Sequence, residues 1–235
     1  MKQPASGEKP LRVDIVTGFP KVCRGPLTES MIRQAKKKNL VQIRVHDLRK
    51  YTHDKHHTID DTPYGGGAGM VLKPEPIFEC IEKLQSRRVY DEVIYLSADG
   101  ETFTQQMATE LSLKKNLLFL CGHYKGVDDR VRQTLVTKEI SIGDYVLTGG
   151  ELPAMTVVDA VVRLIPGVLG DAESLLSDSF QENLLGAPVY TRPAEFRSMK
   201  VPDILLSGDH KKIGEWRTEI RTERTRKRRN DLLSS

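Results

Sequence analysis

Glycines gather in three short segments whose spacing could form a small-ligand site: residues 65–69, 122–126 and 143–150. Each segment follows or flanks a predicted strand, and an open α/β sheet usually binds its ligand at such strand ends. Glycine tolerates positive φ and lets a ligand approach the backbone closely. These segments predict a glycine-lined pocket, but they do not by themselves name a reaction.

The common nucleotide-binding and hydrolase motifs are absent from the chain. No GxxxxGK[ST] run occurs, and the stretch that begins at Gly67 lacks the third glycine of GxGxxG and does not directly follow a strand. GxSxG and HExxH are absent as well. The sequence therefore argues against a P-loop NTPase and a Rossmann-type oxidoreductase.

Metal and disulfide chemistry have little support in the sequence. The three cysteines, Cys23, Cys80 and Cys121, are odd in number and in no paired spacing, which argues against a disulfide framework and a zinc site. Three histidines between residues 53 and 57 lie in a polar loop with Lys55 among them. This setting favours a solvated or phosphate-facing loop over a ligand set, so no metal site is predicted.

The elements that would position these segments alternate between strands and helices. Strands are predicted for 11–18, 41–48, 91–97, 116–121 and a short stretch from 138, and helices for 26–38, 74–87, 103–112 and 153–165. Residues 41–48 alternate cleanly, whereas 116–121 is continuously apolar, as expected for a strand buried on both faces. The order indicates an α/β domain with a mostly parallel sheet.

The helix predicted for 153–165 is apolar nearly all round. Pro153 suits its first turn, because the missing N–H of proline would have been unpaired there anyway. A helix of this composition must be buried on both sides, either in the core or in a subunit interface.

Positive charge is concentrated at the carboxyl end of the chain. The net charge of the 235 residues is +4, yet residues 211–235 hold nine Lys or Arg against four Asp or Glu. A segment such as RTERTRKRRN is an electrostatic footprint for a polyanion and favours nucleic acid. A solvated helix with i,i+4 pairs such as Lys211–Glu215 and Glu223–Lys227 is the compatible alternative.

Membrane and secretory classes are not supported. The longest apolar stretch, 157–169, contains Asp159, Arg163 and Pro166 and is shorter than the ~20 residues that span a bilayer. The amino-terminal residues are polar and have no apolar core for a signal peptide. The expected location is the cytoplasm.

A series of longer motifs goes beyond these arguments. In chain order they are YGGGAGM (64–70), YLS (95–97), CGHY (121–124), SIGDYVLTGGELPA (141–154), IPGVLG (165–170), DSF (178–180), YTRP (190–193) and LSG (206–208). The series resembles the bacterial tRNA (guanine-N1)-methyltransferases of the SPOUT superfamily, which methylate guanine 37 beside the anticodon. The resemblance extends from about residue 11 to 233.

The resemblance implies a fold and a methyl donor. It implies a SPOUT-type α/β fold with a carboxyl-terminal trefoil knot, in which S-adenosylmethionine is bound by the knot loops, and a homodimer with shared active sites. The domains would be an extension (1–10), a knotted donor-binding domain (11–170), a mobile linker (171–190) and a small basic helical tRNA-binding domain (191–235). The residues implied to bind the donor are Tyr95, Leu96, Ser97, Gly122, Tyr124, Ser141, Ile142, Gly143, Tyr145, Leu147, Gly149, Gly150 and Pro153.

The resemblance also assigns two catalytic roles. Asp178 would accept the N1 proton of guanine, and Arg163 would stabilise the negative charge that develops towards O6. Each residue has a plainer interpretation: an ion pair of Arg163 with Asp159, or a helix N-cap at Asp178 and Ser179. The basic segment 211–229 would bind the anticodon arm.

The chain departs from the usual family pattern beside the central tyrosine of CGRYEG, where it has His123 and Lys125 instead of Arg and Glu. Lys125 places a positive charge where the family usually has Glu, so a contact or metal role of that Glu does not carry over to this chain. No role for magnesium is assigned. Two alternatives therefore accompany the main reading. One is a SPOUT methyltransferase with another RNA target, and the other is a catalytically impaired RNA-binding homologue.

Overall fold

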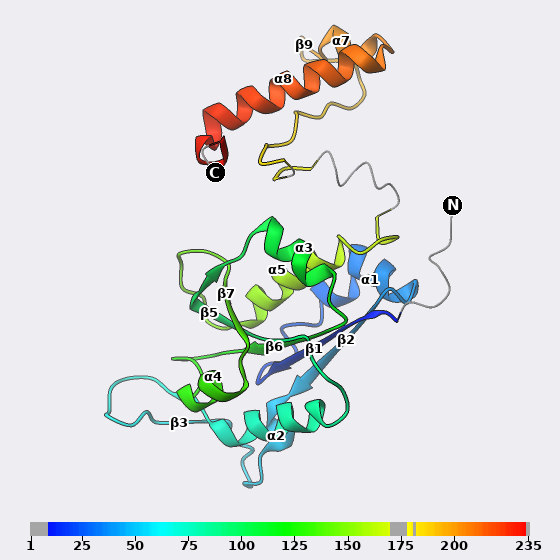
Figure 1. Ribbon diagram of the computed structural model, residues 1–235. Coiled ribbons are helices and arrows are strands. Elements are labelled where there is room, and N and C mark those ends of the chain that lie inside the picture. The colour runs from blue at the N-terminus through cyan, green and yellow to red at the C-terminus, as the bar shows by residue number, and fades with distance from the viewer. Residues whose placement is uncertain (1–8, 170–177, 181, 234–235) are drawn as a thin grey trace. The chain divides into compact units, whose positions relative to one another are not determined.

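The computed structural model describes residues 9–169, 178–180 and 182–233 (Figure 1). The chain divides into two compact units, 1–170 and 171–235. The first unit holds a five-stranded sheet of order β2-β1-β6-β5-β7 in which every pairing is parallel. Its strands are β1 (Leu11–Thr17), β2 (Val41–Asp47), β5 (Glu92–Thr102), β6 (Asn116–Cys121) and β7 (Lys138–Ser141). The predicted α/β class with a mostly parallel sheet is confirmed.

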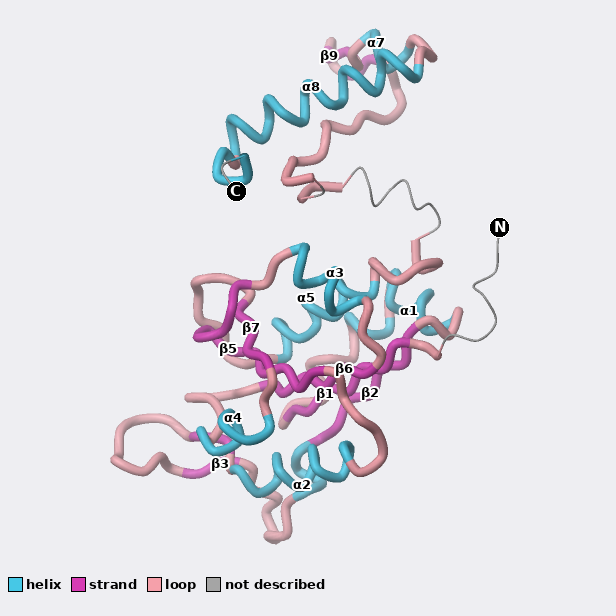
Figure 2. The backbone as a smooth tube through the Cα atoms, viewed as in Figure 1, coloured by secondary structure: helices cyan, strands magenta, loops and turns pink. Residues whose placement is uncertain are grey.

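Helices cover both faces of this sheet (Figure 2). One face carries α1 (Ser30–Lys37), α3 (Gln105–Ser112) and α5 (Glu151–Val162), and the other carries α2 (Pro74–Gln85) and α4 (Asp129–Leu135). Side chains of β6 alternate between the two cores, with Phe119 in one and Leu118 and Leu120 in the other. The prediction that 116–121 is buried on both faces is therefore confirmed.

Several elements differ from their predictions. The helix predicted for 26–38 is a 3-10 turn (Pro26–Thr28) followed by α1, because Glu29 is extended and Ser30 has φ +49°. Strand β5 continues to Thr102, since the chain bulges after Leu96 and then pairs with β7 again. Helix α4, whose first turn is capped by the Asp128 carboxylate, was not predicted.

Helix α5 begins two residues earlier and ends three residues earlier than predicted. Pro153 lies in its first turn, as expected. Eight of its residues are buried, and the exposed ones, Leu152, Thr156 and Asp159, form one stripe. The core of a single chain therefore buries most of this helix and leaves one narrow face exposed.

Shorter elements complete the two units. In the first, 3-10 turn Leu48–Tyr51 follows β2, and hairpin β3 (Asp60–Asp61)–β4 (Val71–Leu72) carries the glycine segment 65–69. The second contains hairpin β8 (Glu195–Phe196)–β9 (Met199–Lys200), α7 (Asp203–Leu206), α8 (His210–Arg228) and 3-10 turn Asn230–Leu233. Of the predicted linker and extension, 171–177, 181 and 1–8 lie outside the described residues. No helix in the described ranges is long and apolar enough to cross a membrane.

A buried charge cluster is centred on Asp14 of β1. The Asp14 side chain is fully buried and accepts two hydrogen bonds of 2.7 Å from Arg12 and one of 2.8 Å from the Tyr90 hydroxyl. His46 Nε2 lies 2.6 Å from the same carboxylate. Burial alone would raise the pKa of Asp14, but the hydrogen bonds from His46, Arg12 and Tyr90 outweigh it and hold the pKa well below its ordinary value.

We expect Asp14→Asn to lower the free energy of unfolding by about 3–5 kcal/mol, because it leaves Arg12 buried without its counter-charge. Because the pKa of Asp14 is lower in the folded protein than in the unfolded chain, the ionised carboxylate stabilises the fold at pH values above about 4, the pKa of an unfolded aspartate. This stabilisation is lost progressively as the pH falls below about 4 towards the pKa of the folded protein. Urea unfolding at pH 7 and at pH 3 measures both effects. The exposed Asp129→Asn variant is the control, and an Asp14→Asn protein as stable as this control would contradict the prediction.

Candidate functional site

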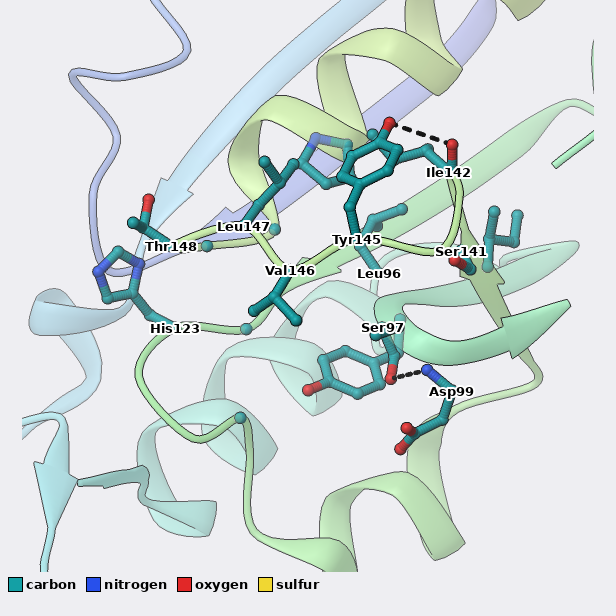
Figure 3. A pocket seen from close by; sticks show the side chains of 18 of the residues that line it. Leu96, Ser97, Asp99, His123, Ser141, Ile142, Tyr145, Val146, Leu147 and Thr148 are labelled. Atoms are coloured by element: carbon teal, nitrogen blue, oxygen red, sulfur yellow. Dashed lines mark hydrogen bonds between the residues drawn. The ribbon is translucent and has the colours of Figure 1, made fainter. Parts of the chain in front are cut away.

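One cavity of about 230 Å³ lies at the carboxyl ends of three adjacent strands of the sheet (Figure 3). All thirteen residues that the sequence analysis assigned to donor binding line it: Tyr95, Leu96, Ser97, Gly122, Tyr124, Ser141, Ile142, Gly143, Tyr145, Leu147, Gly149, Gly150 and Pro153. They are spread over almost sixty positions of the chain. The fold thus brings together residues that only the motifs had connected.

The parallel sheet explains why these segments meet. Strands β6, β5 and β7 are neighbours and run in the same direction, so the residues that follow them emerge at one edge. The cavity is bounded by the bulged middle of β5, where its pairing with β6 ends, by the loops after β6 and β7, and by the first turn of α5. Glycine segments 122–126 and 143–150 lie in these walls. Of the described residues, those at 65–69 do not line the cavity, which corrects the expectation of a pocket formed by all three segments.

The loop after β7 is held open by its own hydrogen bonds. The Ser141 hydroxyl accepts a hydrogen bond from the Gly143 N–H at 3.2 Å. The Tyr145 hydroxyl donates to the Ile142 carbonyl at 3.2 Å, as Figure 3 shows. Gly143 has φ +142°, and a Cβ there would lie 2.6 Å from the Tyr145 ring. This geometry requires glycine and leaves Tyr145, Val146 and Leu147 exposed at the rim.

The loops after β6 and β7 touch through their backbones. The Gly150 N–H donates to the Gly122 carbonyl at 2.8 Å, and His123 pairs with Gly149 in an isolated antiparallel bridge. Behind them lies the buried Tyr95 ring, whose hydroxyl would be 2.8 Å from a Cβ on Gly122. Burial raises the pKa of Tyr95 above its ordinary value, so its phenol is neutral.

The cavity also has charged lining residues that the sequence analysis did not assign to it. Arg132, on the unpredicted helix α4, forms two 2.9 Å hydrogen bonds with Glu139 and one of 3.2 Å with Asp99. Its guanidinium lies 5.7 Å from the centre of the Tyr95 ring. Asp99 itself is in the unpredicted extension of β5. Arg132 thus joins Glu139 and Asp99 in an ionic network beside the cavity.

His123 occupies a distinctive position in the wall. Its ring stacks on Phe19 with centroids 4.1 Å apart and meets Tyr124 edge-on. Its Nδ1 lies 3.8 Å from the carboxylate of the buried Glu151. The hydrogen bond to this carboxylate comes from the Thr17 hydroxyl. A buried glutamate thus links β1, the loop after β6 and the start of α5.

Lys125 connects the cavity wall to the first glycine segment. Its N–H donates to the Met70 carbonyl at 3.0 Å, and its side chain passes Gly69, where a Cβ would be 3.1 Å from Lys125 Cγ. The segment at 65–69 therefore packs against the outside of the cavity wall through Lys125.

The two residues to which the resemblance gave catalytic roles belong to different units. Arg163 is half-buried directly after α5. Asp178 is half-buried in the second unit, at the start of a turn in which the Ser179 hydroxyl accepts a 2.9 Å hydrogen bond from the Gly186 N–H. Ser179 therefore closes a local turn.

Side chains that could bind metal are dispersed. His53 pairs with Glu79 at 2.7 Å on the surface, and His57 contacts the Thr52 hydroxyl. Cys23, Cys80 and Cys121 are buried free thiols. Across the described ranges, no group of three or more His, Cys, Asp or Glu is arranged to hold a metal ion.

We expect Gly150→Ala to lower kcat/KM for the methyl transfer that the resemblance implies by roughly 10–100-fold. A Cβ on Gly150 would lie 2.9 Å from Cys121 Cα and 3.0 Å from Gly122 N, so the two loops must separate and widen the cavity. Gly25→Ala is the matched control, because nothing lies within 4 Å of its Cβ. Donor affinity measured by calorimetry would fall with kcat/KM. An unchanged affinity would show that this backbone contact does not shape the cavity.

Comparisons with known proteins agree on one family. The sequence model of the family described as tRNA (Guanine-1)-methyltransferase TrmD matches residues 11–235. A tRNA (guanine-N(1)-)-methyltransferase of Chlorobaculum tepidum is 56% identical over 223 residues, which cover 95% of this chain and 97% of that protein. Proteins of the same name from Bacteroides thetaiotaomicron (57%; 95% and 99%) and Flavobacterium psychrophilum (53%; 96% and 100%) are similarly close.

The family match covers nearly all of the chain, and each relative is matched over almost its full length. Three of the motifs that carry the resemblance, YLS, CGHY and SIGDYVLTGGELPA, also contribute to the cavity walls. The chain therefore belongs to the tRNA (guanine-N1)-methyltransferase family.

Proposed function

We propose that this protein transfers a methyl group from S-adenosylmethionine to N1 of guanine 37 in tRNA. Methylation of guanine N1 in tRNA follows from the family and from the names of the relatives. The single observation that carries the donor assignment is the convergence of all thirteen motif residues on one cavity. The alternative readings, another RNA target or an impaired RNA-binding homologue, are not favoured by these relatives.

The cavity has the chemistry to hold an adenosyl group. Leu96 and Ile142 lie in its walls and the exposed Leu147 at its rim, so they offer apolar faces to the adenine ring. The glycine turns at 122 and 149–150 present backbone N–H and C=O groups that can read the edge of the base. The bound donor would supply an electrophilic methyl group on its sulfonium.

Two residues of the chain would remove the N1 proton of the acceptor guanine and stabilise the negative charge that its removal leaves. N1 of guanine carries a proton at neutral pH, so a base must remove it as the new N–CH₃ bond forms. Asp178 is the proposed base, and Arg163 the proposed cation that stabilises the negative charge spreading to O6. Both side chains are half-buried, which strengthens electrostatic interactions relative to bulk water.

Assembly and substrate binding complete the proposal. The fold is proposed to contain a trefoil knot, with the loop after β7 threaded against the loop after β6. The functional form is proposed to be a cytoplasmic homodimer in which each active site uses residues of both subunits. The exposed stripe of α5, with Leu152 at its start, is available for such an interface. The basic residues of α8 would hold the anticodon arm.

A methyl-transfer assay with labelled S-adenosylmethionine tests this function. Two unmodified transcripts of one tRNA would be compared, with guanine or adenosine at position 37. We expect label to enter only the guanine transcript. Equal labelling of both would assign the activity to another nucleotide, and no labelling despite tRNA binding would support the impaired homologue.

A further inference from the structure

A second cavity lies within the carboxyl-terminal unit, between segment 187–194 and helices α7 and α8. It encloses about 900 Å³ and shares no lining residue with the cavity at the strand ends. Residues of two motifs that carried the family resemblance without a role line it: Tyr190, Thr191 and Arg192 of YTRP, and Leu206 of LSG.

The charge on the walls has one sign. Arg192, Arg217 and Arg221 line the cavity, and its described lining residues include no Asp or Glu. The Arg221 side chain is engaged within the unit, with the Leu185 carbonyl at 3.4 Å and the Glu182 carboxylate at 3.5 Å. Arg192 and Arg217 are exposed, so they can reach an occupant. Guanidinium groups favour phosphate oxygens, which they bind in a bidentate manner.

Exposed apolar side chains accompany this charge. The Tyr190 side chain is 50% exposed, and Val189 and Leu206 are more exposed still. Thr225 is the one residue classed as buried among the described residues of this unit, so these side chains are not used to build a core. An exposed aromatic ring beside guanidinium groups is a combination that binds unpaired nucleotides, because bases stack on the ring while the cations hold the backbone.

We propose that this cavity binds an unpaired nucleotide of the substrate tRNA, with its base on Tyr190 and its phosphate on Arg192 and Arg217. The proposal rests on the proposed function, in which tRNA is the substrate. A base-paired stem does not fit, because its bases are stacked inside the helix and cannot reach Tyr190. A segment of a second copy is the less suitable occupant, because a mixed-charge protein surface would meet three cations and no carboxylate in these walls.

Affinity measurements on the full-length protein test the stacking contact. The probe is an unmodified tRNA transcript, and its Kd is measured by fluorescence anisotropy for the wild type, Tyr190→Ala and Tyr190→Phe. We expect Tyr190→Ala to raise this Kd roughly tenfold and Tyr190→Phe, which keeps the ring, to leave it within about twofold. Phe196→Ala is the matched control, since Phe196 is an exposed aromatic residue of the same unit outside the cavity. Calorimetry should give the same donor Kd for all four proteins.

Salt dependence tests the phosphate contact. Arg217→Gln should reduce the slope of log K against log salt by about one, which corresponds to the loss of one phosphate contact. Tyr190→Ala should weaken binding without changing that slope. The mass of each free protein is measured by sedimentation in parallel. If the cavity held a segment of a second copy instead, the variants would release that copy and their measured mass would fall.

Three results would overturn the nucleotide site: wild-type tRNA affinity in Tyr190→Ala, equal losses in Tyr190→Ala and Phe196→Ala, or a changed mass of the free Tyr190→Ala protein. A wild-type protein that binds tRNA but transfers no methyl group would overturn the proposed reaction alone. The two proposals therefore fail in distinguishable ways.

Discussion

Asp178→Asn is expected to lower kcat for methyl transfer by about 10²–10⁴-fold, the usual contribution of a general base. Asparagine keeps the size and polarity of the side chain but cannot accept the N1 proton of guanine. Because the change is isosteric, the Kd values for donor and tRNA should stay close to those of the wild type. Single-turnover kinetics on a guanine-37 transcript measure the effect.

A pH profile separates a catalytic role for Asp178 from a structural one. Raising the pH should partly restore the rate of Asp178→Asn, because the N1 proton then leaves without help from the enzyme. Asp203→Asn, which alters an exposed carboxylate of the same unit, is the matched control and should behave as the wild type. A wild-type kcat in Asp178→Asn would exclude this residue as the base.

Arg163→Gln is expected to lower kcat by roughly 10²–10³-fold, comparable to the removal of a donor that stabilises an oxyanion. Proton removal from N1 leaves negative charge on O6, and glutamine supplies no positive charge to meet it. Arg163→Lys should retain part of the activity, because it keeps the charge but loses the planar, two-pronged geometry of the guanidinium. The rates are measured at saturating donor and tRNA, so that kcat is separated from binding.

The control for Arg163 is Arg33→Gln, an exposed arginine on α1 of the same unit. It makes an equal change of net charge far from the carboxyl end of α5 in sequence. If both variants lost the same activity, the effect would be one of overall charge. If Arg163→Gln raised KM for tRNA and left kcat intact, Arg163 would be a binding residue.

The sequence predicted the sheet well because its strands carry strong local signals. Residues 117–121 are apolar throughout, and the structure divides them between two cores, which explains why neither face of this strand is polar there. Two features had no such signal. The continuation of β5 beyond Leu96 depends on pairing with the distant strand β7. Helix α4 has seven residues with only Val131 classed as buried, so its hydrophobic periodicity is weak.

The cavity was harder to predict from residue types and spacing alone. Glycine clusters indicated a ligand pocket, but the segment at 65–69 proved to pack outside it, because proximity at a sheet edge is a property of topology and not of composition. The thirteen lining residues came from motif resemblance. Asp99 and Arg132 were missed because they belong to the two elements that the pattern did not predict.

The most direct test of the central claim is the chemical identity of the product. An unmodified tRNA transcript with guanine at position 37 is incubated with the protein and S-adenosylmethionine, digested with a nuclease and examined by mass spectrometry. We expect one methyl group, present as 1-methylguanosine in the single fragment that contains position 37. Any other methylated nucleoside, a methyl group elsewhere in the tRNA, or an unmethylated tRNA would contradict it.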